Sequence, residues 1–180
     1  MKKLIAMMML AVAISQCYGE IPAHGVAETS TADNYICIAD SSIVINGGAR
    51  LTTKVIYSHN KIRDYVFTLS ILGHSDVPKG SRLLLKFSND SICEESVYFD
   101  AEAHIEYIMG LDCSEVSPSY ILSPRTLTFI KNHELIKMRM EVAGEFLDLS
   151  PKKEDSDYIR ESFEFLKTKV DNGKDFYEDF

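Results

Sequence analysis

Long apolar runs, paired-cysteine motifs and glycine-rich loops are missing from this sequence of 180 residues. After the first 14 residues, no stretch reaches the ~18–20 apolar residues that a transmembrane helix needs, so no transmembrane span is expected. Without a CxxC pair, neither a redox-active dithiol nor a zinc knuckle is predicted. No GxSxG elbow, phosphate-binding loop or HExxH helix is present either. The composition, 46% hydrophobic and 26% charged with no excess of Pro or Gly, is that of an ordinary soluble globular chain.

The amino terminus has the order of a secretory signal peptide. A short basic start, Met1–Lys3, precedes an apolar run from Leu4 to Ile14. The run has no polar face, so it does not fit an amphipathic helix packed on a domain. Small residues stand around a cleavage site after Gly19. We therefore expect residues 1–19 to be removed and the protein to be exported, periplasmic or secreted.

Cys17 admits an alternative, the acylated cysteine of a lipoprotein. Such sites usually have small residues just before the cysteine, and here the preceding residue is Gln16. A lipid anchor at Cys17 therefore stands as the alternative to cleavage after Gly19.

Basic residues are in short supply. The chain has 19 Lys and Arg against 27 Asp and Glu, and loss of the signal peptide would change the net charge from −8 to about −10. A field of this sign repels nucleic acid and anionic membrane surfaces, so neither is an expected partner. Plain solubility explains the acidity.

Three cysteines would remain in the mature chain: Cys37, Cys93 and Cys113. In an oxidising environment the default is one disulfide and one spare thiol. We favour a Cys93–Cys113 bridge, because both residues lie beside expected turns and enclose a short loop. Such a bridge would contribute roughly 3 kcal/mol. The alternative is three reduced, buried thiols that pack as small hydrophobic groups.

The chain divides into a flexible leader (20–33), a single globular domain (34–173) and an acidic, aromatic tail (174–180) after the signal peptide. Within the domain, strand-rich segments alternate with turns, including a hairpin at Asn46–Gly48 and others near residues 88–91 and 143–145. A further strand is expected over residues 103–110, where the Ala and Glu content also admits a short helix.

Two helices are expected towards the carboxyl end. Ser123 is a suitable N-cap and Pro124 a suitable first residue for a short helix. Later, an apolar stripe at helical spacing predicts an amphipathic helix with Ser156 as its cap; the stripe consists of Ile159, Phe163, Leu166 and Val170. The expected architecture is α+β, mainly an antiparallel sheet of six to nine strands, or a sandwich, with a short helix and a C-terminal amphipathic helix.

This order of strand pairs, "KGSRLLLKF", a Ser-Pro helix, "LIKMRME" and a final amphipathic helix resembles small exported bacterial proteins of uncharacterised function. The resemblance spans about residues 50–172 and consists of hydrophobic patterning. It implies the fold and export, and it implies no catalytic residues.

Few residues of the sequence indicate a metal site or a catalytic site. His104 and Glu106 share a strand face, yet such pairs are common by chance, and no metal site or cofactor is predicted. Cys113 matches no nucleophile signature. A catalytic pair of acids, as in glycosidases, is one interpretation of the abundant carboxylates. The better interpretation is that they are solvated surface acids: Glu94, Glu95, Asp100, Glu102, Glu106, Asp112 and Glu115. No catalytic residue is therefore predicted.

A basic stripe is the least ordinary feature. Lys137 and Arg139 point to the wet side of one strand, and Arg82 and Lys86 alternate on another. If the strands are neighbours, the four side chains could receive an anionic ligand or partner. The alternative is that these are ordinary charged side chains on the exposed face of a sheet, where they limit edge-to-edge association.

The expected function is an exported, non-enzymatic module that binds an unknown protein or component of the bacterial cell envelope. The alternatives are a small extracytoplasmic hydrolase that uses acidic residues or Cys113, and a structural or inhibitor protein.

Overall fold

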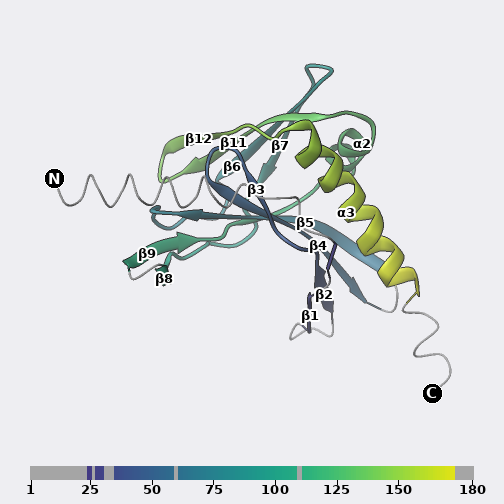
Figure 1. Ribbon diagram of the computed structural model, residues 1–180, viewed down its shortest axis with the longest axis horizontal. Coiled ribbons are helices and arrows are strands. Elements are labelled where there is room, and N and C mark those ends of the chain that lie inside the picture. The colour runs from purple at the N-terminus through teal and green to yellow at the C-terminus, as the bar shows by residue number, and fades with distance from the viewer. Residues whose placement is uncertain (1–23, 26, 31–34, 59–60, 109–110, 173–180) are drawn as a thin grey trace.

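The computed structural model describes residues 24–25, 27–30, 35–58, 61–108 and 111–172 (Figure 1). The predicted signal peptide with Cys17, and the tail 174–180, lie outside the described residues.

Strands dominate the described part of the chain, which contains twelve of them and two helices. The strands are β1 (Ala27–Ser30), β2 (Ile36–Ala39), β3 (Ile43–Ile45), β4 (Ala49–Ser58), β5 (Lys61–Leu72), β6 (Arg82–Phe87), β7 (Ile92–Ser96), β8 (His104–Ile108), β9 (Leu111–Val116), β10 (Ser119–Ile121), β11 (Leu135–Val142) and β12 (Glu145–Leu149). The helices are α2 (Pro124–Asn132) and α3 (Lys153–Asn172). Each of the strand pairs in this part of the chain is antiparallel, which confirms the α+β class with a short helix and a C-terminal helix.

The larger sheet has eight strands and is built on the long hairpin of β4 and β5. Its order is β1-β2-β4-β5-β9-β8, with β3 on β4 and β10 on β5. Strand β5 pairs along one edge of β4. Along the opposite edge, β4 pairs first with β3 and then with β2, so two short strands share that edge. The eight strands of the larger sheet agree with the expected sheet of six to nine, whereas β1 lies in the stretch predicted as a flexible leader.

The smaller sheet has four strands in the order β12-β11-β6-β7. It approaches the larger sheet at Val97 and Tyr120, which form an isolated antiparallel bridge, and at Ser150, whose amide donates to the Asn46 carbonyl. Gly47 is required at this second contact. Its φ is +115°, and a Cβ there would lie 2.8 Å from both the Asp148 carbonyl oxygen and Leu149 Cδ2.

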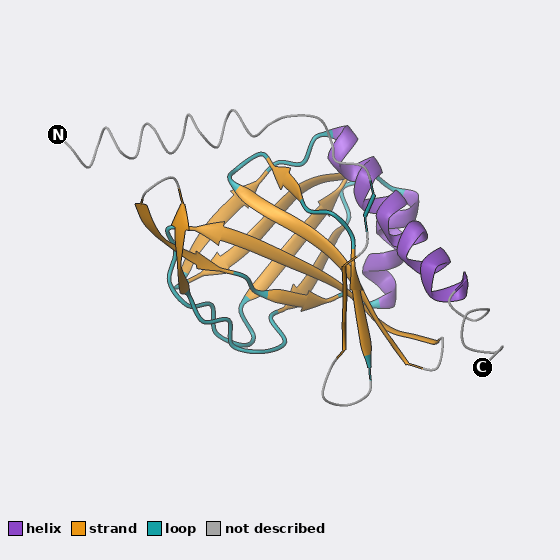
Figure 2. Cartoon of the chain, turned by 60° about the horizontal axis from the view of Figure 1, so that its bottom comes forward, coloured by secondary structure: helices purple, strands orange, loops and turns teal. Residues whose placement is uncertain are grey.

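The hydrophobic core lies between the two sheets, and Figure 2 shows both helices together on one side of the strands. Helix α3 packs on β4, β5 and β11. All four residues of its predicted apolar stripe are buried, and the Phe163 ring stacks on Phe67 and meets Tyr65 edge-on. None of the helices in the described part of the chain is both long enough and apolar enough to cross a membrane.

Polar contacts fix α3 at two further points. Ser162 Oγ hydrogen-bonds the Thr53 hydroxyl on β4, and Ser156 Oγ accepts from the Leu135 amide at the start of β11. Ser156 is therefore not the helix cap that we predicted. The helix begins at Lys153, and the Asp155 carboxylate accepts the Lys152 amide just before it.

A register shift changes the face pattern of β11. Strict alternation with Lys137 and Arg139 would place Ile136, Met138, Met140 and Val142 on the core face. The register shift between Leu135 and Lys137 instead buries Leu135 and leaves Ile136 37% exposed. The alternation holds from Met138 onwards, where the pairing is regular.

The predicted Cys93–Cys113 disulfide is not formed. Cys93 is buried on β7 of the smaller sheet, whereas Cys113 lies on β9 of the larger sheet, opposite Glu106. Cys37, Cys93 and Cys113 are free thiols, and Cys113 lies within a strand rather than beside a turn. The alternative of three reduced, buried thiols therefore holds in part: only Cys93 is buried, and Cys37 and Cys113 are half-buried.

Candidate functional site

The four residues of the predicted basic stripe lie on one face of the smaller sheet. Strands β6 and β11 are neighbours, and Lys86 stands directly opposite Lys137. Arg82 lies beside Glu141 of β11, and Arg139 pairs across to Asp148 of β12. The alternating pattern therefore did place the four side chains close together.

Each of these cations has an acidic partner. Arg82 binds Glu141 (3.1 Å), Lys86 binds Asp90 (2.9 Å), and Lys137 and Arg139 share Asp148 (2.8 and 2.5 Å). The hydrogen bonds from Arg139 and then Lys137 hold the pKa of Asp148 well below its usual range. This face is thus charge-compensated, and it is a weaker anion site than the cations alone suggest.

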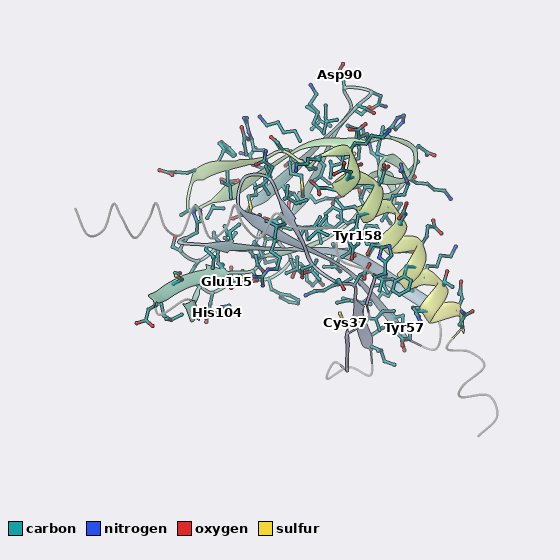
Figure 3. All side chains as sticks on the ribbon, in the orientation of Figure 1. Cys37, Tyr57, Asp90, His104, Glu115 and Tyr158 are labelled. Carbon is teal, nitrogen blue, oxygen red and sulfur yellow. The ribbon has the colours of Figure 1, made fainter. Side chains whose placement is uncertain are left out.

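The other residues considered for chemistry are scattered. Figure 3 shows His104 and Glu115 together on β8 and β9, far from Asp90 at the tip of the β6–β7 hairpin. The Glu106 side chain lies outside the described residues. Within the described ranges, no three His, Cys, Asp or Glu side chains group as metal ligands would.

A groove between α2 and α3 has more of the features of a binding site. Its volume is about 200 Å³. The lining side chains come from both helices and from β5: Tyr65, Leu127, Thr128, Ile130, Lys131, Arg160, Phe163, Glu164 and Lys167. We call this the α2–α3 groove.

Helical periodicity explains why the groove has an apolar floor and a charged rim. Ile130 and Phe163 are buried at 4% and 7% exposure, and Leu127 and Tyr65 are half-buried beside them. One position further along each helix, the side chains turn outwards to solvent, as Lys131 and Glu164 do.

The rim carries three cations and one acid, although the chain as a whole is acidic. Arg160 is already paired with Asp157 one turn earlier. Neither Lys131 nor Lys167 forms an ion pair with any described residue. Burial, with the nearby charge of Glu164, raises the pKa of the Tyr65 phenol, so its hydroxyl stays protonated at neutral pH.

A buried carboxylate fixes the position of α2, and with it half of the groove. Glu95 of β7, only 8% exposed, accepts hydrogen bonds from the Ser123 amide (2.9 Å), the Ser123 hydroxyl (2.7 Å) and the Thr126 hydroxyl. Ser123 caps the helix as predicted, since its side chain accepts the Thr126 amide. The negative charge also suits the positive end of the helix dipole.

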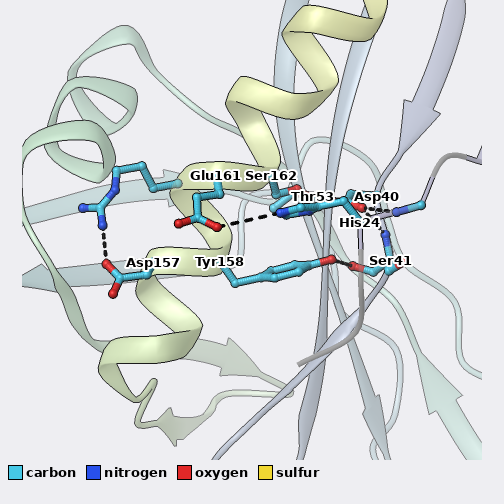
Figure 4. A network of polar contacts seen from close by, with 10 residues as sticks. His24, Asp40, Ser41, Thr53, Asp157, Tyr158, Glu161 and Ser162 are labelled. Atoms are coloured by element: carbon cyan, nitrogen blue, oxygen red, sulfur yellow. Dashed lines mark hydrogen bonds and ion pairs between the residues drawn. The ribbon is translucent and has the colours of Figure 1, made fainter. Parts of the chain in front are cut away.

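A second polar cluster lies on another face of α3, at the same level along the helix as the groove (Figure 4). Asp40, whose side chain is fully buried, binds His24 Nδ1 (2.5 Å) and accepts the Gly25 and Ser41 amides. The His24 ring stacks on Tyr158 and Phe165, at centroid distances of 4.6 and 5.1 Å.

This cluster attaches the segment around His24 to the domain. The Tyr158 hydroxyl donates to the Ser41 carbonyl, and burial, with the charge of Asp40, raises the Tyr158 pKa to about 12. His24 Nε2 faces Glu161 at 4.0 Å. Both ring nitrogens thus face carboxylates, which suits a structural clasp between the leader and α3.

Neither the groove nor the clasp was predicted as a site from the sequence. Both helices were predicted, yet the contact between α2 and α3 depends on the path of β11 and β12, which periodicity does not determine. Lys131 and Lys167 looked like ordinary surface lysines. The one feature that could have indicated a shared site is that both lysines lie beside the apolar stripes of two helices near the carboxyl end of the chain.

Comparison of this chain with protein-family models, with curated proteins and with solved structures finds no match in any of the three.

Proposed function

We propose that this protein is an exported, non-enzymatic binding module that takes a segment of a partner protein in the α2–α3 groove. The observation that carries the proposal is the combination of an apolar floor with Lys131, Arg160 and Lys167 at the rim, on an otherwise acidic chain. The sequence pattern of residues 1–19 supports export.

The size of the groove favours a peptide over a whole small molecule. Ligand pockets usually enclose about 300–1,000 Å³, whereas this groove offers about 200 Å³. That space suits one large side chain anchored in a shallow site, as when a short segment lies across two helices. The Ile130 and Phe163 floor favours an aromatic or aliphatic anchor.

Charge complementarity specifies the residues around that anchor. Lys131 and Lys167 have no acidic partner among the described residues, so carboxylates on the segment would supply one to each. Glu164 lies on the same rim and would repel an acidic residue placed beside it, so the carboxylates of the segment should lie next to Lys131 and Lys167 instead. The proposed occupant is thus an acidic segment with one central aromatic or aliphatic side chain.

Fluorescence anisotropy with defined peptides tests the proposal. The probe is a labelled heptapeptide with a central Phe flanked by Asp and Glu, and its counterpart carries Lys at every acidic position. We expect the acidic peptide alone to bind, with an affinity that falls as salt rises.

Charge reversal then locates the site. Lys131→Glu and Lys167→Glu should each weaken binding about fivefold or more, while Lys153→Glu makes the same change on the first turn of α3, outside the groove, and should have no effect. Equal binding of both peptides, or an equal loss in the Lys153 variant, would overturn the proposal. So would turnover of a hydrolase substrate that is abolished by Cys113→Ser.

A further inference from the structure

We propose that the carboxyl-terminal segment of this same chain, residues 173–180, occupies the α2–α3 groove and competes with the partner. This inference rests on the proposed function of the groove as a peptide site.

The segment has the composition that the groove calls for. Its sequence, GKDFYEDF, contains three acidic and three aromatic residues and one lysine. The acids would face Lys131 and Lys167, and an aromatic ring would lie on the apolar floor.

The segment is long enough to reach the whole groove. Helix α3 ends at Asn172, and at 1.5 Å per residue the groove residues Lys167 and Arg160 lie about 8 and 18 Å back along the axis. Eight extended residues span about 26–29 Å. Gly173 stands directly after the helix, where glycine allows the chain to reverse without strain.

The same distances indicate which ring would enter the groove. Phe176 follows the helix end by four residues, or about 13 Å of extended chain. Phe163 precedes that end by nine residues, or about 13 Å of helix. After a reversal at Gly173, Phe176 would therefore lie level with Phe163, with Asp175 beside it on the side of Lys167.

Tethering makes even a weak interaction effective. A short flexible link gives a segment an effective concentration in the mM range, so an intrinsic Kd of about 0.1 mM would leave the groove mostly occupied and raise the partner's apparent Kd about tenfold. The segment would thus set a threshold concentration for partner binding.

Lysine footprinting in the full-length protein tests this inference. Acetylation of individual lysines is followed by mass spectrometry in the unaltered chain and in Phe176→Ser, whose substitution lies outside the described core. Lys131 and Lys167 should react at least about threefold faster in the variant if occupancy falls from a large majority to a minority. Lys153 is the internal control and should not change, and unchanged rates at all three lysines would overturn the inference.

A charge swap provides an independent result. Lys167→Glu should expose Lys131 to acetylation, and adding Asp175→Lys should restore its protection. A double variant no better protected than the single one contradicts the inference.

The acidic peptide probe separates this inference from the proposed function. If the segment competes, the probe should bind the Phe176→Ser chain about tenfold more tightly than the unaltered chain. Equal binding to both, with unchanged footprints, overturns the segment's role and leaves the peptide site standing. Failure to bind either chain, with altered footprints, overturns the partner function and leaves the intramolecular contact.

Discussion

Removal of the Glu95 carboxylate should loosen α2 and lower the stability of the whole domain. Glu95 Oε1 accepts three hydrogen bonds, from the Ser123 amide, the Ser123 hydroxyl and the Thr126 hydroxyl. Hydrogen bonds to a charged group contribute about 1.5–3 kcal/mol each. They share one oxygen and are not additive, and the two hydroxyls also bond each other at 3.1 Å. We therefore expect Glu95→Ala to reduce the free energy of unfolding by about 3 kcal/mol.

Thermal and urea unfolding measure this change. For a domain of this size, about 3 kcal/mol corresponds to a fall in Tm of about 6–12 °C. Glu94→Ala is the matched control, because Glu94 is the exposed neighbour on the opposite face of β7, and its loss should cost less than about 0.5 kcal/mol.

Peptide binding gives a second readout, since α2 supplies Leu127, Ile130 and Lys131 to the groove. At a temperature where the Glu95 variant is folded, its affinity for the acidic probe should still be reduced. A variant within about 1 kcal/mol of the Glu94 control would refute the assigned role of the carboxylate.

Three other changes follow from features of the fold. Gly47→Ala should destabilise the protein more than Gly48→Ala in urea unfolding: both residues have positive φ, but only a Cβ at Gly47 meets a neighbour, so equal losses would contradict the contact with β12. The pKa of Asp148 is lower in the folded protein than the ordinary value of ~3.9, so its stabilisation is present above that pH and lost as pH falls through the folded value. Asp148→Asn should therefore flatten the acid limb of the stability–pH curve, and an unchanged limb would count against the pairing. Asp40→Ala should speed hydrogen exchange at the Gly25 amide, as its acceptor is lost, and an unchanged exchange rate would argue against the clasp.

Local signals made much of the fold predictable. The hairpin at Asn46–Gly48 follows from residues that tolerate positive φ, and the buried face of α3 follows from its spacing. Pro124 after Ser123 marked the start of α2 in the same way. Each of these features is decided within a few residues of chain, where propensity and periodicity act.

Contacts between distant segments were not predictable. The register shift after Leu135 depends on how β11 meets β6, and the partners of Glu95 lie about 30 residues away. The basic stripe was located correctly, but its acidic partners on β12 and at the hairpin tip were not foreseen. Hydrophobic patterning identifies which side of a strand is buried; it does not say which strand or charge lies opposite.

The position of α3 has a consequence for the order in which the protein folds. The helix is the last element of the described chain, yet it seals the β4–β5 hairpin near the beginning, and its Ser162 meets Thr53 across 109 residues. A chain that emerges amino-terminus first, from a ribosome or through an export channel, therefore holds its longest hairpin with an open apolar side until the final helix arrives. During that interval the protein depends on whatever covers this side, and completion of the core coincides with completion of the groove.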